Sequence, residues 1–238
     1  YCWTLTPFAL KFVFDADESI HRVTYLDADL WFRKNPKAIF GEFEKSGKHV
    51  LITDHNYAPE YDQSLTSGQY CVQFMTFTRP DGEVVRQWWE DRCIEGCFAR
   101  YEDGKFGDQK YLDDWGIRFN KQVHILQNKE LILAPWNATR FPFGNSILWH
   151  FQGLRIVKKG SDFYAYYGFY NLPQITRESV YGQYILDLKS AIELLDGVGF
   201  KVKQQEKITR RQRIKNIIYG LMMPFGFSYR LININTKK

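Results

Sequence analysis

Cysteine is scarce in this sequence, and its scarcity excludes one class of protein at the outset. The 238 residues contain four cysteines, too few for a disulfide-stabilised scaffold of this length. Cys93 and Cys97 also lack partner Cys or His residues at the spacing of a zinc site. We therefore expect the four thiols to be buried and reduced.

The sequence also shows no secretory leader pattern and no long hydrophobic run. The chain starts at Tyr1 rather than Met, without a charged segment followed by an apolar one, so we expect the true N-terminus to be missing. The apolar stretch 217–227 is interrupted by Pro224 and is far short of the ~20 residues that span a bilayer. No internal repeat is evident, and 45% hydrophobic with 25% charged residues indicates an ordinary globular domain.

Charge is unevenly distributed along the chain. Residues 201–238 contain ten Lys or Arg and one acidic residue, whereas residues 1–200 are net acidic. We expect a catalytic domain over 1–200 and a basic tail over 201–238. Apolar residues at helical spacing among arginines over 208–222 predict a basic amphipathic helix on an anionic membrane surface, or a solvated helix folded back on the domain. No nucleic-acid partner is expected, and the predicted location is cytoplasmic, peripheral on the inner membrane face.

Apolar periodicity predicts strands separated by helices, which is typical of an α/β sheet. Residues 5–15 are expected to form a helix that has Pro7 in its first turn, and residues 81–100 a helix with Asp81 as N-cap. A short helix is expected from residue 36 to 43 and a loop from 56 to 69. The predicted strands are 22–26, 50–53, 70–78, 123–126 and 131–134.

Acidic residues follow two of these predicted strands directly. Asp27 and Asp29 come after the strand 22–26, and Asp54 and His55 after the strand 50–53. Ligands of α/β sheets gather at the carboxyl ends of strands, so both groups lie where chemistry is expected. We expect the strand to end in a turn that brings the carboxylates of Asp27 and Asp29 together, and their oxygens suit Mn²⁺ or Mg²⁺.

Three motifs in order resemble those of GT-A fold glycosyltransferases of the glycogenin and lipopolysaccharide galactosyltransferase type. They are Tyr25-Leu26-Asp27-Ala28-Asp29, Gly107-Asp108-Gln109 and His150-Phe151-Gln152-Gly153. The resemblance spans roughly residues 22–153 and implies a mixed Rossmann-like sheet flanked by helices. The first strands of the nucleotide-binding half, which precede the metal motif in that family, are absent from this sequence.

The resemblance also implies a set of site residues. Asp27, Asp29 and His150 would hold the metal, and Asp108 or Gln109 would border the anomeric carbon. Ala28, Gln73 and Gly153 would contact the nucleotide sugar, although the family's Asn-x-Gly signature is here Cys71-Val72-Gln73. The usual Lys-Pro-Trp after the last motif is absent as well, so Arg155 or Lys158 would replace it at the diphosphate.

The implied activity is metal-dependent transfer of a hexosyl group from a nucleotide diphosphate sugar, with UDP-sugar expected, to a glycan or lipid-linked acceptor with retention. Trp136, Asp54 and His55 are acceptor-binding candidates. The candidate site residues also have plainer interpretations: Asp54 could belong to a simple turn, His150 could be a core histidine, and Asp108 could be a helix cap. One alternative is a haloacid-dehalogenase-type phosphatase that uses Asp27 as nucleophile. Its motif normally has Thr or Val two positions after the second Asp, where this sequence has Trp31, which argues against it. The other alternative is a non-catalytic membrane-surface binding protein.

Overall fold

The structure is a computed structural model that describes residues 2–159, 162–168, 170–200 and 231–233. It divides into two compact units, Tyr1–His150 and Phe151–Lys238. The predicted tail 201–238, including the amphipathic helix over 208–222, lies outside the described residues except for 231–233. The division expected at residue 200 therefore stays a prediction.

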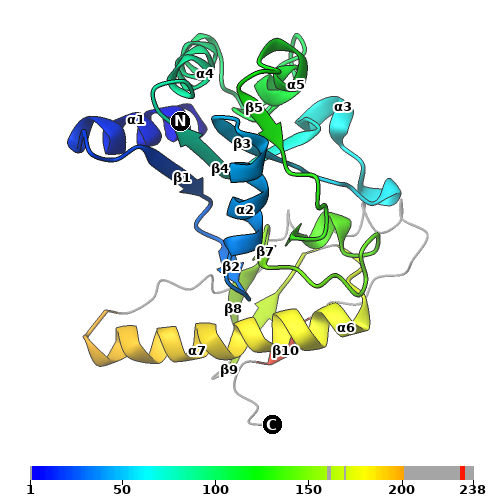
Figure 1. Cartoon of the computed structure of the whole chain (residues 1–238). Helices are drawn as coiled ribbons and strands as arrows, with labels where there is room; N and C mark the ends of the chain where they lie inside the picture. Colours follow the sequence, from blue (N-terminus) through cyan, green and yellow to red (C-terminus); the bar gives the residue numbers. More distant parts are fainter. Residues whose placement is uncertain (1, 160–161, 169, 201–230, 234–238) are drawn as a thin grey trace. The chain divides into compact units, whose positions relative to one another are not determined.

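The first unit is built on a mixed four-stranded sheet with the strand order β1-β4-β3-β5 (Figure 1). Its strands are β1 (Arg22–Leu26), β3 (Val50–Asp54), β4 (Tyr70–Thr78) and β5 (Val123–Ile125). Strand β4 lies between β1 and β3 and is antiparallel to both, whereas β5 runs parallel to β3. Strands β1 and β3 therefore point the same way, and their carboxyl ends reach the same edge of the sheet.

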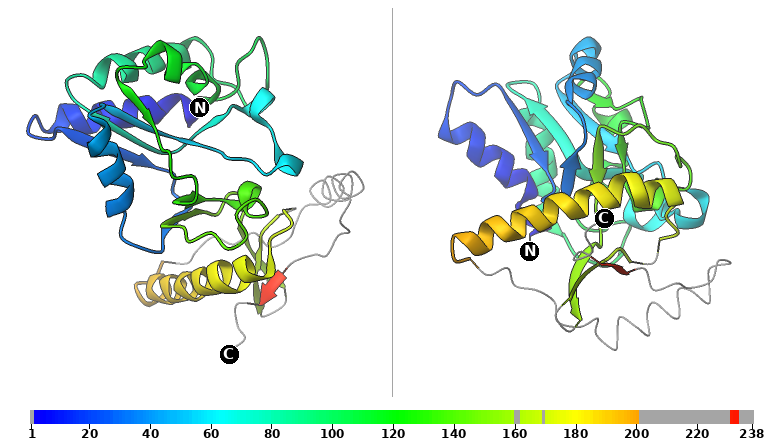
Figure 2. Two further views of the ribbon diagram at one scale, coloured as in Figure 1. Left: turned by 45° about the vertical axis from the view of Figure 1, so that its right-hand side comes forward. Right: turned by 90° about the horizontal axis from the view of Figure 1, so that it is seen from below.

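Helices cover both faces of this sheet, which confirms the predicted α/β class (Figures 1 and 2). Residues of α1 (Thr6–Ala16), α4 (Glu83–Glu95) and α5 (Trp115–Arg118) pack with Val50 and Ile52 on one face. Residues of α2 (Lys37–Ser46) pack with Leu51 on the other face. Successive residues of β3 thus face opposite layers, as a strand buried on both sides requires.

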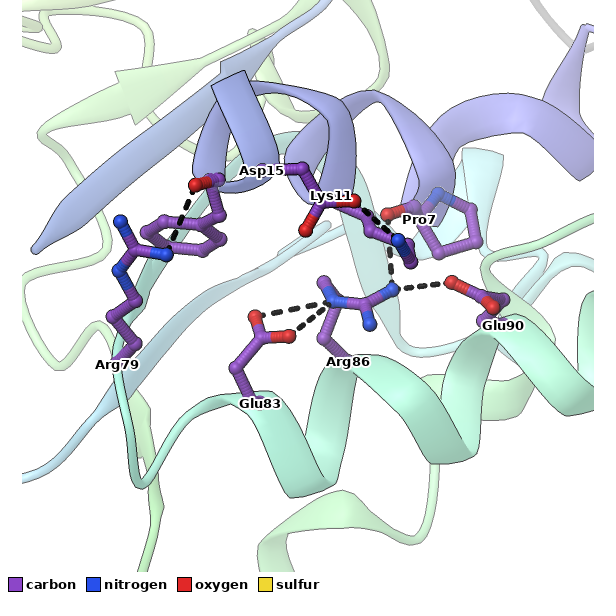
Figure 3. Close-up of polar contacts among 8 residues, drawn as sticks. Pro7, Lys11, Asp15, Arg79, Glu83, Arg86 and Glu90 are labelled. Carbon is purple, nitrogen blue, oxygen red and sulfur yellow. Dashed lines mark hydrogen bonds and ion pairs between the residues drawn. The ribbon is translucent and has the colours of Figure 1, made fainter. Parts of the chain in front are cut away.

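Two arginines fix α1 against the neighbouring elements (Figure 3). Arg79, just after β4, donates to the main-chain oxygen of Phe14 at 2.9 Å, near the C-terminal end of α1 where carbonyl groups lack helical partners. Arg86 of α4 is 3% exposed, pairs with carboxylates of its own helix and donates to the oxygen of Pro7 at 3.4 Å. Both ends of α1 are thereby held in place, which matters because α1 contributes a contact near the site.

A second, three-stranded sheet of the first unit has the order β2-β7-β6. It consists of β2 (Leu30–Phe32), β6 (Ile132–Leu133) and β7 (Leu148–His150). Strand β2 is antiparallel to β7, and Leu30 lies opposite His150. Short helical segments complete the unit: Trp3–Leu5, Pro59–Tyr61, α3 (Ser64–Ser67), Lys110–Leu112 and Pro135–Asn137.

The second unit combines a small antiparallel sheet with a long helix. The sheet has the order β10-β9-β8, from β8 (Arg155–Lys159), β9 (Asp162–Tyr166) and β10 (Leu231–Asn233). Helix α6 (Gln174–Thr176) and a π-helical turn (Arg177–Tyr181) lead into α7 (Gly182–Gly197), drawn yellow to orange in Figure 2. Ala165 of β9 and Ile185 of α7 form its small buried core. In the part of the chain that is described, no helix is both long and apolar enough to cross a membrane.

Several local expectations were wrong. Gly82 rather than Asp81 is the N-cap of α4, without a side-chain cap bond, and the helix ends at Glu95 rather than near residue 100. The segment 56–69 includes two short helical turns instead of being loop throughout. All four thiols are free, but Cys2 is exposed and Cys97 is only partly buried, contrary to the expected burial.

Candidate metal centre

A turn at the end of β1 brings the two acidic side chains together, as the sequence predicted. Strand β1 ends at Leu26, and the amide of Leu30 donates to the carbonyl of Asp27 at 3.3 Å. The chain then continues directly into β2, where Leu30 pairs with His150 of β7. The second small sheet therefore delivers His150 to the turn that carries Asp27 and Asp29.

The three side chains form a compact group at this point. Nε2 of His150 lies 3.0 Å from Oδ1 of Asp29 and 3.9 Å from Oδ2 of Asp27. One ligand atom from each residue lies within 4.8 Å of the others. The His150 side chain is 7% exposed, whereas those of Asp27 and Asp29 are 32% and 47% exposed. The group is thus anchored on its buried imidazole and open on its carboxylate side.

The electrostatics of the two carboxyls differ. Burial raises the pKa of Asp27, although His150 and the Tyr25 hydroxyl oppose the shift. Burial also acts to raise the pKa of Asp29, but the hydrogen bond and charge of His150 outweigh it, so that the net pKa is lowered. Two carboxylates that face one imidazole nitrogen form a group that a bound cation would stabilise.

Buried polar neighbours hold this group in position. The Tyr25 hydroxyl donates to Oδ1 of Asp27 at 2.9 Å. Gln73, 2% exposed on β4, accepts at its side-chain oxygen from Nδ1 of His150 at 2.6 Å. The main-chain carbonyl of Gln73 accepts from the amide of Asp27 at 3.0 Å. Gln73 therefore contacts two of the three residues, and its contact with the nucleotide sugar stays a prediction.

The helix cap that the local sequence predicted at Asp108 is not found there. Gln109, not Asp108, is the N-cap of the short helix Lys110–Leu112, and it makes no side-chain cap bond. Asp108 is 5% exposed and accepts at Oδ2 from the Thr6 hydroxyl at 2.9 Å. Burial raises its pKa to about 7, and the charge of Asp27 adds to the rise while Thr6 opposes it. The side-chain amide of Gln109 donates from Nε2 to the main-chain carbonyl of Ser67 at 2.7 Å.

Two of the acceptor candidates, His55 and Trp136, belong to a series of ring contacts that reaches His150. The rings of His55 and Tyr57 stack at 4.6 Å, and Trp136 packs edge-on at 5.2 Å from both His55 and His150. The indole of Trp136, 5% exposed, donates to the carbonyl of His55 at 2.8 Å. Asp54 accepts from the Gln69 side chain at 3.2 Å. Acceptor binding by Trp136, Asp54 and His55 stays a prediction.

The remaining predicted residues divide between the two units. Ala28 is exposed between the two aspartates of the turn. Gly153 and Arg155 are exposed residues of the second unit, and Gly153 has a φ of +79°, a conformation that favours glycine. Lys158 belongs to β8 of the same unit. Their contact with a diphosphate stays a prediction.

Two polar residues of the site were not predicted from the sequence. Thr6 reaches Asp108 from α1, and Tyr25 reaches Asp27 from two residues earlier in β1. Tyr25 had a local signal, since residues two apart in a strand share a face. Thr6 and Asp108 are 102 positions apart, so no local pattern could have indicated their contact.

Comparisons with known proteins give relatives of similar sequence. The chain is 31% identical over 176 residues to uncharacterized protein YfnF of Bacillus subtilis (strain 168), covering 66% of this chain and 57% of YfnF. It is 30% identical over 213 residues to uncharacterized protein YfnD of the same organism, covering 81% of this chain and 66% of YfnD. The chain therefore spans less than two thirds of the length of these relatives. No protein-family model matches the chain.

Two solved structures share a more distant similarity. A glycosyltransferase involved in the glycosylation of the major capsid of PBCV-1 is 10% identical, with a TM-score of 0.45 over 64% of this chain and 70% of that chain. The apo form of mouse xyloside xylosyltransferase 1 is 14% identical, with a TM-score of 0.38 over 64% of this chain and 63% of that chain. These TM-scores are too low to support an argument about activity, which therefore depends on the side chains.

Proposed function

We propose that this chain is the catalytic part of a metal-dependent GT-A glycosyltransferase that uses a nucleotide diphosphate sugar. The observation that carries the proposal is the convergence of Asp27, Asp29 and His150. The acid-x-acid pair alone is a weak signal, because such pairs occur in many solvated turns. A buried imidazole supplied from 121 positions beyond Asp29 and directed at both carboxylates is a far more specific arrangement.

The chemistry of the three side chains fits a divalent cation. Two carboxylates and one imidazole are ligands suited to Mn²⁺, and Mg²⁺ is the second candidate because it prefers oxygen ligands alone. Three protein ligands leave further coordination positions for phosphate oxygens of a substrate. A cation held there would neutralise the charge that develops on a diphosphate leaving group. The 32% and 47% exposure of the aspartate side chains is consistent with access from solvent on that side.

The other roles in this proposal are assigned to the remaining predicted residues. Asp108 or Gln109 borders the transferred sugar, and Arg155 or Lys158 contacts the diphosphate. The favoured donor is a UDP-sugar, the acceptor is a glycan or lipid-linked glycan, and transfer proceeds with retention of configuration. Docking of the segment 208–222 to an anionic membrane surface would bring a lipid-linked acceptor close to the site.

The proposal is tested by incubating the full chain with a panel of UDP-sugars, with Mn²⁺ or with EDTA, and measuring release of UDP. Manganese-dependent release that is lost in Asp27→Ala and retained in Asp91→Ala, an exposed aspartate of α4, would support it. Release of inorganic phosphate from phosphate esters would instead favour the phosphatase alternative. Release of neither UDP nor phosphate with any metal would favour the non-catalytic binding protein.

A further inference from the structure

Gln73 is a long amide side chain buried in the middle of a strand, which demands an explanation. It is 2% exposed, and burying an amide without hydrogen-bond partners is unfavourable. Its neighbours Phe74 and Met75 on β4 are fully buried apolar residues, as expected for a central strand. Gln73 therefore places a polar side chain among buried apolar residues, and its contacts indicate its role.

Both carbonyl groups of Gln73 are directed at residues of the metal centre. The main-chain carbonyl accepts from the amide of Asp27 at 3.0 Å, which fixes the point where β1 ends. The side-chain carbonyl accepts from Nδ1 of His150 at 2.6 Å, which fixes the plane of the imidazole. One residue of β4 thus links the end of β1 to a side chain of β7.

We propose that Gln73 is a positioning residue that selects the tautomer of His150 competent for metal binding. The inference rests on the proposed function, in which His150 is a metal ligand. An amide oxygen only accepts hydrogen bonds, so the nitrogen facing it must carry the proton. The proton on Nδ1 leaves the lone pair of Nε2 directed at Asp27 and Asp29. Partners of this kind behind a ligand histidine orient the ring and make it a better ligand.

An amide suits this position better than the carboxylate that often stands behind a ligand histidine. Asp27 and Asp29 already bring two negative charges to the group, which match one divalent cation. A third carboxylate beside His150 would add charge that the cation cannot balance, at a buried position where charge is weakly screened. Gln73 supplies the same directional bond without this charge.

The test begins with nitrogen NMR of the histidine rings in the full chain, kept metal-free with EDTA. The His150 signals are identified by their absence in His150→Gln. We expect wild-type His150 to carry its proton on Nδ1 whenever the ring is neutral. A neutral ring protonated on Nε2 in the wild type would overturn the proposal, whatever any variant does.

The second part compares variants for Mn²⁺ affinity by calorimetry. Gln73→Met keeps the length and burial of the side chain but removes the acceptor, so we expect a mixture of tautomers and a 10- to 100-fold loss of affinity. Gln73→Glu restores an acceptor and should restore the Nδ1 proton. Thr76→Val is the matched control, because Thr76 is a buried polar residue of the same strand that bonds Thr24 instead. It should leave both the tautomer and the affinity unchanged.

The outcomes separate this inference from the proposed function. Wild type that binds Mn²⁺, together with Gln73→Met of unchanged affinity, would refute the role of Gln73 and leave the metal centre intact. Wild type that binds no Mn²⁺ would refute the metal centre and with it the purpose of the tautomer selection. Equal losses in Gln73→Met and Thr76→Val would show that the effect is general to β4 and would also overturn the proposal.

Discussion

Burial shifts the pKa values of Asp108 and His55, two groups near the site, in opposite directions. This yields a prediction about how the stability of the protein depends on pH. Burial raises the pKa of Asp108 from 3.8 to about 7 and lowers that of His55 from 6.5 to about 4. In the folded state the protonated Asp108 is favoured, so its contribution is fully present below pH 3.8 and is lost as the pH rises through 7. His55 is favoured neutral, so its contribution is fully present above pH 6.5 and is lost as the pH falls through 4.

Between about pH 4 and 6.5 the two contributions to stability therefore oppose each other. Comparing wild type with a variant in which residue 108 cannot titrate isolates the contribution of Asp108. Asp108→Asn keeps a carbonyl that can accept from Thr6 but has no proton to lose. Linkage gives a change of about 3 kcal/mol between pH 5 and pH 8 for a pKa raised by this amount. Relative to wild type, Asp108→Asn should gain about 3 kcal/mol in free energy of unfolding over that interval.

The assay is urea denaturation of wild type and Asp108→Asn at pH 5, 6, 7 and 8, in EDTA so that metal binding does not contribute. Other titrating groups are common to both proteins and cancel in the difference between the two curves. A constant difference across the pH range would refute the assignment of a raised pKa to Asp108. A difference that changes in the opposite direction would contradict the sign of the argument.

Three further substitutions test contacts within the first unit. Arg86→Met removes the cation from a buried ion-paired group and should cost roughly 3 kcal/mol in urea denaturation; a loss below about 1 kcal/mol would show that the pairing is dispensable. Trp136→Phe removes the 2.8 Å bond to the carbonyl of His55, which still accepts from the Asn137 side chain at 3.0 Å, and should cost about 1 kcal/mol, measured in the same way; unchanged stability would show that the indole bond contributes nothing. Gly82→Ala places a methyl group 2.3 Å from the carbonyl oxygen of Thr78 and should lower the free energy of unfolding by about 1–3 kcal/mol. An unchanged melting temperature would contradict this expectation.

Local sequence patterns predicted the elements that carry the site. The strands 22–26 and 70–78 have the predicted bounds in the structure, since β-branched and aromatic residues bounded by turn-forming residues mark such strands clearly. The turn after β1 was expected from the acid-x-acid pair that directly follows the β-branched and aromatic run 22–26. Residue periodicity could not give the strand order, in which β4 separates β1 from β3.

Contacts between distant residues set the limit of prediction from sequence. Read from its neighbours alone, His150 resembled a core residue, and only the family resemblance indicated metal binding. In the structure it is buried and also faces both aspartates. Asp81 and Asp108 were expected to cap helices because aspartate commonly does so. Asp108 bonds Thr6 of α1 instead, which depends on the packing of α1 and lies beyond any local signal.

The central claim is that Asp27, Asp29 and His150 bind one divalent cation, and the most direct test is calorimetric titration of the full metal-free chain with Mn²⁺. The account predicts one site in wild type and in the surface control Asp91→Ala, and loss of that site in Asp29→Ala. Circular dichroism of the three proteins establishes that the fold is kept. Equal Mn²⁺ binding by wild type and Asp29→Ala, or no binding by wild type, would contradict the account.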